Sequence, residues 1–419
     1  MKTTSLQETI DRIRAGQRSV AEEFEATRSR IEAADTELRS FVEVATELPP
    51  VVEDGPLHGV PIGVKDIIDV AGYPTRCGSS ITDPAPVTTT AACVQRLVDL
   101  GAVVVGKSVT TEFAYFAPGP TRNPAAAGRT PGGSSSGSAA AVAAGLVPLA
   151  LGSQTAGSLT RPASFCGVSG MVLAHGSVDL SGVTGLSPSL DSLGLITRTV
   201  ADLEIVHRAF TGDATTVTGE PAFLVWSGSE LGEIDPAMTR LIDALAADLA
   251  ADHEVAPLDW DDHVHTLTSD HLIVMGYEAA REHPELLAEH RDALSAPLVQ
   301  LLAEGAETTH DQYEGARYRR DRSRLDLAER MPAGTVLIGP AAPGPAPEGL
   351  EATGSPVLSR AWQLLGLPVI TVAGATTTDG LPLGVQVIGW PGREADLLAA
   401  AALVEDRVRG MTVGREESV

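Results

Sequence analysis

Short runs of β-branched and aliphatic residues alternate with helical segments along most of the chain, and this alternation restricts the fold more than any other feature. Such alternation is typical of α/β proteins, in which helices cover both faces of one sheet. The clearest strand-forming runs are residues 102–105, 147–151, 335–338, 369–372 and 383–388, and the clearest helices are residues 90–100, 136–144 and 396–408. We therefore predict an α/β protein with a central mixed, mostly parallel β-sheet that helices cover on both faces.

The chain shows no internal boundary. Its 419 residues would suffice for one large domain or two ordinary ones. No linker divides it, and no repeat recurs along it. Residues 221–331 form a charged, more variable section that is largely helical from residue 269 onward. We predict one domain over residues 1–419, in which the helical section 221–331 walls the binding pocket and decides specificity.

Two capping boxes predict helices near the N-terminus. Ser5 with Glu8, and Ser19 with Glu22, have the spacing at which a serine hydroxyl and a glutamate three residues later satisfy each other's backbone N–H groups. Apolar residues at helical spacing follow both pairs. We therefore expect two helices to open the chain.

The charge of the chain limits its partners. Its 30 Lys and Arg residues against 55 Asp and Glu residues give a formal net charge of −25. Such a surface repels phosphate backbones and anionic lipid, so we expect neither nucleic acid nor a membrane as a partner. The three cysteines lack metal-ligand spacing, and the longest apolar run, residues 139–151, is too short to span a bilayer. With no apolar signal segment either, we expect a soluble, cytoplasmic protein without cofactor or metal.

Residues 101–108, Gly-Ala-Val-Val-Val-Gly-Lys-Ser, fit the phosphate-binding pattern GxxxxGK[ST]. That pattern needs a flexible loop after a strand, whose backbone N–H groups surround a phosphate. Here the residues between the glycines are strand formers and a helix ends just before them, so no loop remains. We therefore interpret Lys107 as a structural residue at a strand end.

Three segments place glycines with hydroxyl or amine side chains inside apolar sequence. They are residues 59–66 (GVPIGVKD), 131–138 (PGGSSSGS) and 152–158 (GSQTAGS). A Gly/Ser cluster is usually a flexible linker, and a lysine near a strand end usually reaches solvent. These serines, however, lie between runs that must be core, where unpaired hydroxyls are destabilising. We therefore favour a functional site.

These segments closely resemble the amidase-signature family. The resemblance is good from about residue 55 to 205 and from 335 to 400, and poor in the section between. Its two serines, Ser134 and Ser158, lie 158 − 134 = 24 residues apart, as the family pattern requires. The other matching motifs are Arg161-Pro-Ala, Cys166-Gly, Ser187-Pro-Ser-Leu-Asp, Gly366-Leu-Pro and Leu381-Pro-Leu-Gly-Val-Gln. The resemblance implies the amidase-signature fold.

The resemblance also implies a catalytic triad. Ser158 would be the nucleophile, Ser134 the bridging serine that follows a cis peptide bond, and Lys65 the final base. Lys65 can accept a proton only as a neutral amine, so its pKa must fall from about 10.4 to about 7, at a cost of roughly 4–5 kcal/mol. We expect burial to lower it, with Asp66 and Asp69 directed away from the amine or otherwise paired.

The resemblance assigns the oxyanion hole to the backbone N–H groups of Thr155, Ala156, Gly157 and Ser158. Many members of the family have glycine where this chain has Ala156. Alanine keeps the amide donor but resists a positive φ. The turn must therefore accommodate a Cβ.

Two arginines are candidates for substrate binding. Many relatives have Asp four residues before the nucleophile and Arg two after it, whereas this chain has Gln154 and Thr160, with Arg161 displaced by one. Without its usual acid partner, Arg161 could bind a substrate carboxylate bidentately, as in malonamidase, which the arrangement resembles. An equally weighted alternative is a structural arginine that caps carbonyl groups. Arg129 is the second candidate cation.

We predict an amidohydrolase that cleaves a small linear amide or urea-like compound, with or without a carboxylate, to an acid and ammonia or an amine through an acyl-enzyme. Two alternatives stay open: the glutamine-hydrolysing subunit of a tRNA-dependent amidotransferase, and a catalytically silent binding scaffold. The resemblance also suggests a homodimer. His263, His265 and His271 lack the spacing of a metal site, and we expect them on the solvated surface.

Overall fold

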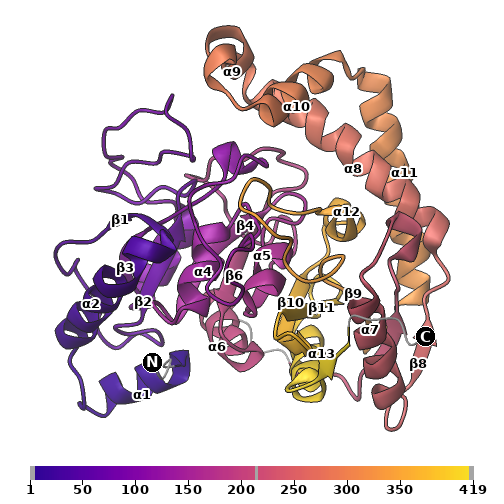
Figure 1. Ribbon diagram of the computed structural model, residues 1–419, viewed down its shortest axis with the longest axis horizontal. Coiled ribbons are helices and arrows are strands. Elements are labelled where there is room, and N and C mark those ends of the chain that lie inside the picture. The colour runs from indigo at the N-terminus through magenta and orange to yellow at the C-terminus, as the bar shows by residue number, and fades with distance from the viewer. Residues whose placement is uncertain (1–4, 213–215, 415–419) are drawn as a thin grey trace.

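One mixed sheet of twelve strands runs through the residues that the computed structural model describes, 5–212 and 216–414 (Figure 1). The strands are ordered β1-β3-β2-β4-β6-β5-β10-β11-β9-β7-β8, and β12 pairs with β10. Their bounds are β1 Phe41–Val44, β2 Pro61–Lys65, β3 Val103–Ser108, β4 Leu149–Gln154, β5 Ser169–Val172, β6 Ser192–Thr197, β7 Ala222–Val225, β8 Val255–Pro257, β9 Thr335–Pro340, β10 Val369–Thr377, β11 Pro382–Ile388 and β12 Thr412–Val413.

The predicted fold class is confirmed, but the sheet is not mostly parallel. Among the described strands, six pairings are antiparallel and five are parallel. Apart from the pairing of the short β12, the parallel pairings lie toward the two edges, and the centre from β4 to β9 is antiparallel. Central strands such as β4 and β6 are nonetheless buried along their whole length. Buried antiparallel strands are as continuously apolar as parallel ones, so composition could not separate the two.

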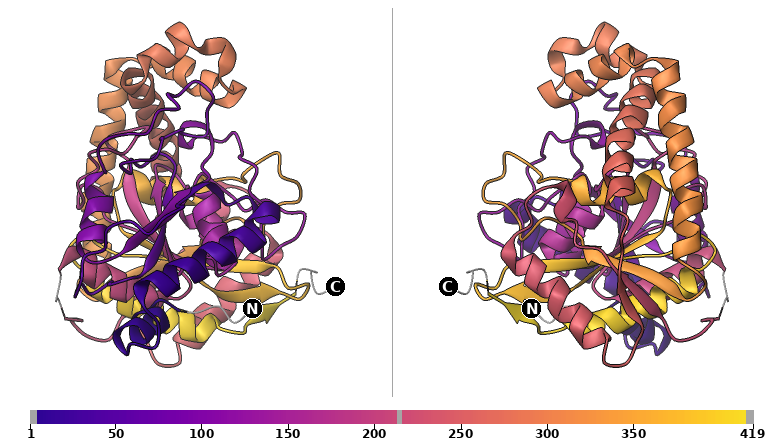
Figure 2. Two further views of the ribbon diagram at one scale, coloured as in Figure 1. Left: turned by 90° about the vertical axis from the view of Figure 1, so that its left-hand side faces the viewer. Right: turned by 90° about the vertical axis from the view of Figure 1, so that its right-hand side faces the viewer.

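Helices cover both faces of the sheet (Figures 1 and 2). Helices α4 and α5 contact each other and strands β2–β4, β10 and β11, while α6 and α13 contact each other and strands β5, β6 and β10. No helix of the described residues combines the length and apolar composition needed to cross a membrane. The helices are α1 Leu6–Arg14, α2 Val20–Leu38, α3 Ala92–Asp99, α4 Ser136–Ala143, α5 Thr160–Cys166, α6 Val200–Thr211, α7 Pro236–Leu249, α8 Asp261–Glu282, α9 Pro284–Glu289, α10 Ala296–Glu307, α11 His310–Arg330, α12 Val357–Leu364 and α13 Glu394–Val408.

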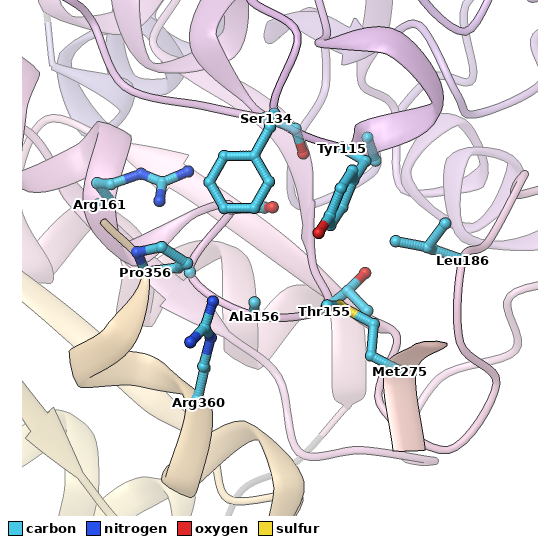
Figure 3. A pocket seen from close by; sticks show the side chains of 13 residues that line it. Tyr115, Ser134, Thr155, Ala156, Arg161, Leu186, Met275, Pro356 and Arg360 are labelled. Carbon is cyan, nitrogen blue, oxygen red and sulfur yellow. The ribbon is translucent and has the colours of Figure 1, made fainter. Parts of the chain in front are cut away.

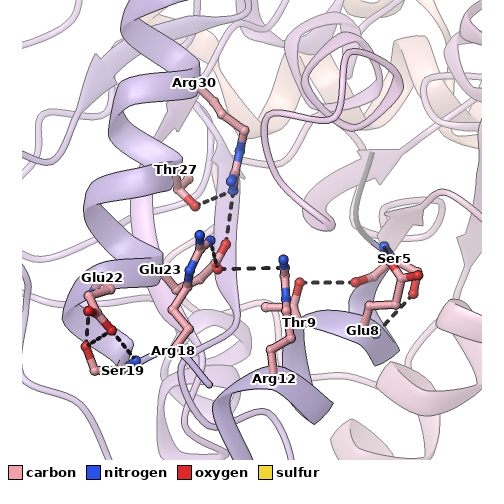
Figure 4. Close-up of polar contacts among 10 residues, drawn as sticks. All are labelled: Ser5, Glu8, Thr9, Arg12, Arg18, Ser19, Glu22, Glu23, Thr27 and Arg30. Atoms are coloured by element: carbon pink, nitrogen blue, oxygen red, sulfur yellow. Dashed lines mark hydrogen bonds and ion pairs between the residues drawn. The ribbon is translucent and has the colours of Figure 1, made fainter. Parts of the chain in front are cut away.

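The two N-terminal helices begin where the sequence predicts. Ser5 caps α1 and Ser19 caps α2, each in a complete capping box (Figure 4). Glu23 of α2 is buried beside three arginines, and accepts hydrogen bonds from Arg18 (2.8 Å) and Arg30 (3.1 Å). The third, Arg12 of α1, lies 3.8 Å away and links the two helices. A buried carboxylate needs such pairing to remain charged.

The section 221–331 is less purely helical than predicted. It begins with β7, α7 and β8, which add two parallel strands to the sheet edge beside β9. These strands have four and three residues, too few to give a periodic signal. Helices α8, α10 and α11 follow and contact one another above the sheet (Figure 1). The carboxylate of Glu278 on α8 accepts from Ser187 (2.6 Å) and Tyr313 (2.6 Å), which ties these helices to the core.

Lys107 has the structural role expected of it. It lies in β3, and its buried ammonium is 3.0 Å from the carboxylate of Asp66. It also donates to the Thr75 hydroxyl at 3.1 Å. The GK[ST]-like residues are therefore part of a buried strand, and Asp66 is paired away from Lys65.

Candidate active site

Lys65 is the last residue of β2, and its side chain is fully buried. Its Nζ donates to Ser134 Oγ at 2.6 Å and to Ser153 Oγ at 2.8 Å. Burial lowers the pKa of Lys65 to about 7, although the negative charge of Asp191 acts in the opposite direction. Near neutral pH much of this amine is therefore uncharged and able to accept a proton.

The serine-rich segment leads into α4, and its hydroxyls are paired inside the core. The peptide bond between Gly133 and Ser134 is cis. Ser135 N donates to Ser158 O at 3.0 Å, which places the segment beside the turn that carries Ser158. Ser138 Oγ donates to Leu151 O at 2.8 Å. The cluster is thus a packed element rather than a linker.

The turn between β4 and α5 carries Ser158 and is held from several sides. Gln154 Oε1 accepts from the backbone N–H groups of Leu159 and Thr160, both at 3.0 Å. The Thr155 hydroxyl donates to the buried carboxylate of Asp191 at 2.5 Å. His271 of α8 donates through Nε2 to the Thr155 carbonyl at 2.8 Å. These contacts fix the backbone of the turn before any ligand arrives.

The backbone N–H groups of the turn are free. Within the described residues, those of Thr155, Ala156, Gly157 and Ser158 donate to no protein acceptor, and all four residues line one pocket. Ala156 is not in the left-handed region, so its Cβ causes no strain. Gly157 has a stricter requirement, because a Cβ there would lie 2.9 Å from Pro356 Cβ. Converging free donors of this kind suit an oxyanion.

The pocket encloses about 360 Å³ of empty space and contains Ser134 and Ser158 (Figure 3). Tyr115 and Phe116 form one side, and Leu186 and Met275 another. Met275 comes from α8, so the section 221–331 does contribute to the wall. Phe116 and its neighbours Phe113 and Ala114 have positive φ values of 37°, 43° and 59°. Backbone of this kind is costly and is found mostly at functional sites.

The two predicted substrate-binding arginines have different positions. Arg161 lines the pocket, but its guanidinium donates to Gly133 O (2.5 Å) and Gly354 O (2.8 Å). Burial, followed by the positive charge of Arg360, lowers the pKa of Arg161 to about 9. Arg129 does not line the pocket; it donates to Ala346 O (2.7 Å) and to the exposed carboxylate of Glu348 (2.9 Å).

Two residues near the turn lie where the sequence did not place them. Arg360 of α12 lines the pocket, yet the sequence offers only one arginine in an apolar helix as a signal. His271 is fully buried rather than on the surface, because the face of α8 that carries it packs on the Thr155 turn. Burial lowers its pKa to about 3, so the imidazole is neutral. Of its two companions, His263 does remain partly exposed, stacked on Trp260.

Comparison with known proteins agrees with this geometry. The amidase family model matches residues 18–398. A glutamyl-tRNA(Gln) amidotransferase subunit of Deinococcus deserti is 33% identical over 408 residues, covering 83% of this chain and 82% of that protein. A crystal structure of an amidase has a TM-score of 0.85 at 29% identity and covers 97% of this chain and 100% of that one. The corresponding protein from Thermotoga maritima has a TM-score of 0.82 at 26% identity, covering 99% and 98%.

The match extends over most of the chain and includes the segments that carry Lys65, Ser134 and Ser158. Sequence relatives and solved structures agree on the same family across nearly their whole length. The chain therefore belongs to the amidase family and is an amide-hydrolysing enzyme.

Proposed function

We propose that Ser158, Ser134 and Lys65 hydrolyse a small linear amide to a carboxylic acid and ammonia or an amine. The observation that supports this most directly is the contact of 2.6 Å between the buried Lys65 amine and the Ser134 hydroxyl, which lies in the same pocket as Ser158. The residues that line the pocket include no His, Asp or Glu. Lys65 is therefore the base for this site.

The proposed steps balance without a cofactor. Neutral Lys65 accepts the proton of Ser134 while Ser134 accepts the proton of Ser158, whose Oγ attacks the carbonyl carbon. The oxyanion that forms accepts hydrogen bonds from the free N–H groups of residues 155–158. The ammonium of Lys65 returns the proton through Ser134 to the leaving nitrogen, the C–N bond breaks, and an ester remains on Ser158. Water hydrolyses that ester by the same relay.

The pocket favours small substrates. Its volume of about 360 Å³ is at the lower end of ligand sites, and Met275 of α8 limits it on one side. We propose that the section 221–331 helps to decide specificity through this wall. Short monoamides, including those of dicarboxylic acids as in the malonamidase-like arrangement, fit the available space.

A hydrolysis screen over short amides, ureas and dicarboxylic monoamides tests the proposal, with Ser158→Ala as the blank. We expect turnover with at least one short amide and none by the variant. A fluorophosphonate should label the intact protein, and Ser158→Ala should abolish the labelling. Labelling that persists in the variant would contradict the role of Ser158, and absence of both labelling and turnover would favour a binding scaffold.

Hydrolysis of glutamine as part of an amidotransferase is the second candidate, because the relatives from Deinococcus deserti and Thermotoga maritima are subunits of such an enzyme. The pocket argues against it, since glutamine carries an ammonium group and no lining residue has an acidic side chain. Release of ammonia from glutamine, only after partner proteins are added, would favour this candidate. Absence of nucleic acid from the partners remains a prediction.

A further inference from the structure

Arg360 is a charged side chain in the pocket without a protein partner. Its guanidinium points from α12 toward the pocket centre (Figure 3). Within the described residues it forms no hydrogen bond and no ion pair, and its Nε is buried and unpaired. Burial lowers its pKa. An uncompensated guanidinium in such a place is costly unless an anion occupies the site for part of the time.

The neighbours of Arg360 increase this demand for an anion. Arg161 also lines the pocket, and the positive charge of Arg360 acts on it. No acidic side chain lines the pocket to balance the two. The Nη atoms of Arg161 are committed to Gly133 O and Gly354 O, whereas all five N–H donors of Arg360 are available. Arg161 therefore contributes charge, and Arg360 contributes charge and donors.

We infer that Arg360 binds a carboxylate of the substrate and selects amides that carry a carboxylate but no ammonium group. The inference rests on the proposed amide hydrolysis at Ser158. A guanidinium binds a carboxylate bidentately, which orients the amide as well as holding it. An ammonium group would meet two positive charges and no acceptor of opposite sign. The substrate class is thus the monoamides of short dicarboxylic acids rather than amino-acid amides.

Three compounds of one chain length separate these features. Glutaramate carries a carboxylate, glutamine adds an ammonium group to it, and pentanamide replaces the carboxylate by a methyl group. We expect glutaramate to have the highest kcat/KM of the three, and the same order among their shorter homologues. Glutamine hydrolysed as well as glutaramate would overturn the inferred substrate class.

The variants Arg360→Met and Arg360→Lys test the residue itself, with Arg208→Met as a matched control at an exposed position of α6. Arg360→Met should lower kcat/KM for glutaramate roughly tenfold to 100-fold and leave pentanamide within about threefold, since a charged hydrogen-bonded pair is lost. Arg360→Lys should restore part of the loss, and Arg208→Met should change neither substrate. Equal losses on both amides would show that Arg360 is only structural.

A binding measurement keeps this inference separate from catalysis. Calorimetry of glutaramate binding to Ser158→Ala, with and without Arg360→Met, requires no turnover. Binding that weakens at least tenfold on Arg360→Met supports the carboxylate site even if the proposed hydrolysis fails. Unchanged binding overturns the inference even if Ser158 proves to be the nucleophile.

Discussion

Replacing Lys65 by methionine should make the protein more stable while abolishing its activity. The pKa of Lys65 is about 7 in the folded protein against 10.5 as its ordinary value. Each pKa unit corresponds to about 1.4 kcal/mol, so holding this amine in the core costs roughly 4 to 5 kcal/mol at pH 7. Methionine fills a similar volume without charge, but loses the bonds to Ser134 and Ser153, worth about 1–2 kcal/mol. The net gain should be about 3 kcal/mol at pH 7.

The pH dependence of this gain follows from the sign of the shift. The folded-state pKa of Lys65 lies below the unfolded-state pKa, so between pH 7 and pH 10.5 the unfolded chain binds one more proton. The parent protein therefore becomes more stable as pH rises through this window, and the destabilisation is complete below pH 7. The advantage of Lys65→Met should shrink by about 3–4 kcal/mol between pH 7 and pH 10.

Chemical unfolding of both proteins at pH 7 and pH 10 measures this difference. Lys107→Met is the matched control, because Lys107 is equally buried but paired with Asp66 at 3.0 Å. Its removal leaves a buried carboxylate unpaired and should destabilise the protein by roughly 3–5 kcal/mol. The reasoning is refuted if Lys65→Met is less stable than the parent at pH 7, or if its advantage is the same at pH 10.

Three further outcomes are expected. Because neutral Lys65 is the active form, kcat/KM should rise tenfold per pH unit below about 7 and level off above it; a profile flat from pH 5 to 9 would exclude it as the base. His271→Ala should lower kcat about tenfold with little effect on KM, because the Thr155 carbonyl loses its donor, whereas His263→Ala should not; an unchanged kcat would show that the turn holds itself. Gly157→Ala should lower kcat/KM at least tenfold through its contact with Pro356, and full activity would show that the turn can shift.

The parts of the site that are continuous in sequence could be predicted. Lys65 ends a short apolar strand, and Ser134 and Ser158 lie in Gly/Ser turns between core segments, so local pattern alone identified them. Capping boxes likewise fixed the start of α1 and α2. In each case the chemical signal lies within a few residues of the group that it concerns.

The remainder depends on contacts between distant segments. Arg360 reaches the pocket only because α12 packs beside the turn that carries Gly157, which lies far earlier in the chain. His271 is buried by the same kind of contact, since its partner Thr155 lies 116 residues before it. Strand direction in the sheet centre also depends on which strands become neighbours, and neighbours such as β5 and β10 are far apart in the chain. No local pattern encodes these pairings.

The burial of the lysines makes covalent amine labelling a reporter of unfolding. The chain has three lysines, Lys2, Lys65 and Lys107, and the latter two are wholly inaccessible. In the part of the chain that the structure describes, a reagent such as an N-hydroxysuccinimide ester thus has no lysine to attack until the sheet opens. Mass spectrometry of the two peptides that contain β2 and β3 would then count opening events directly, and the first label at Lys65 would mark the loss of the catalytic centre.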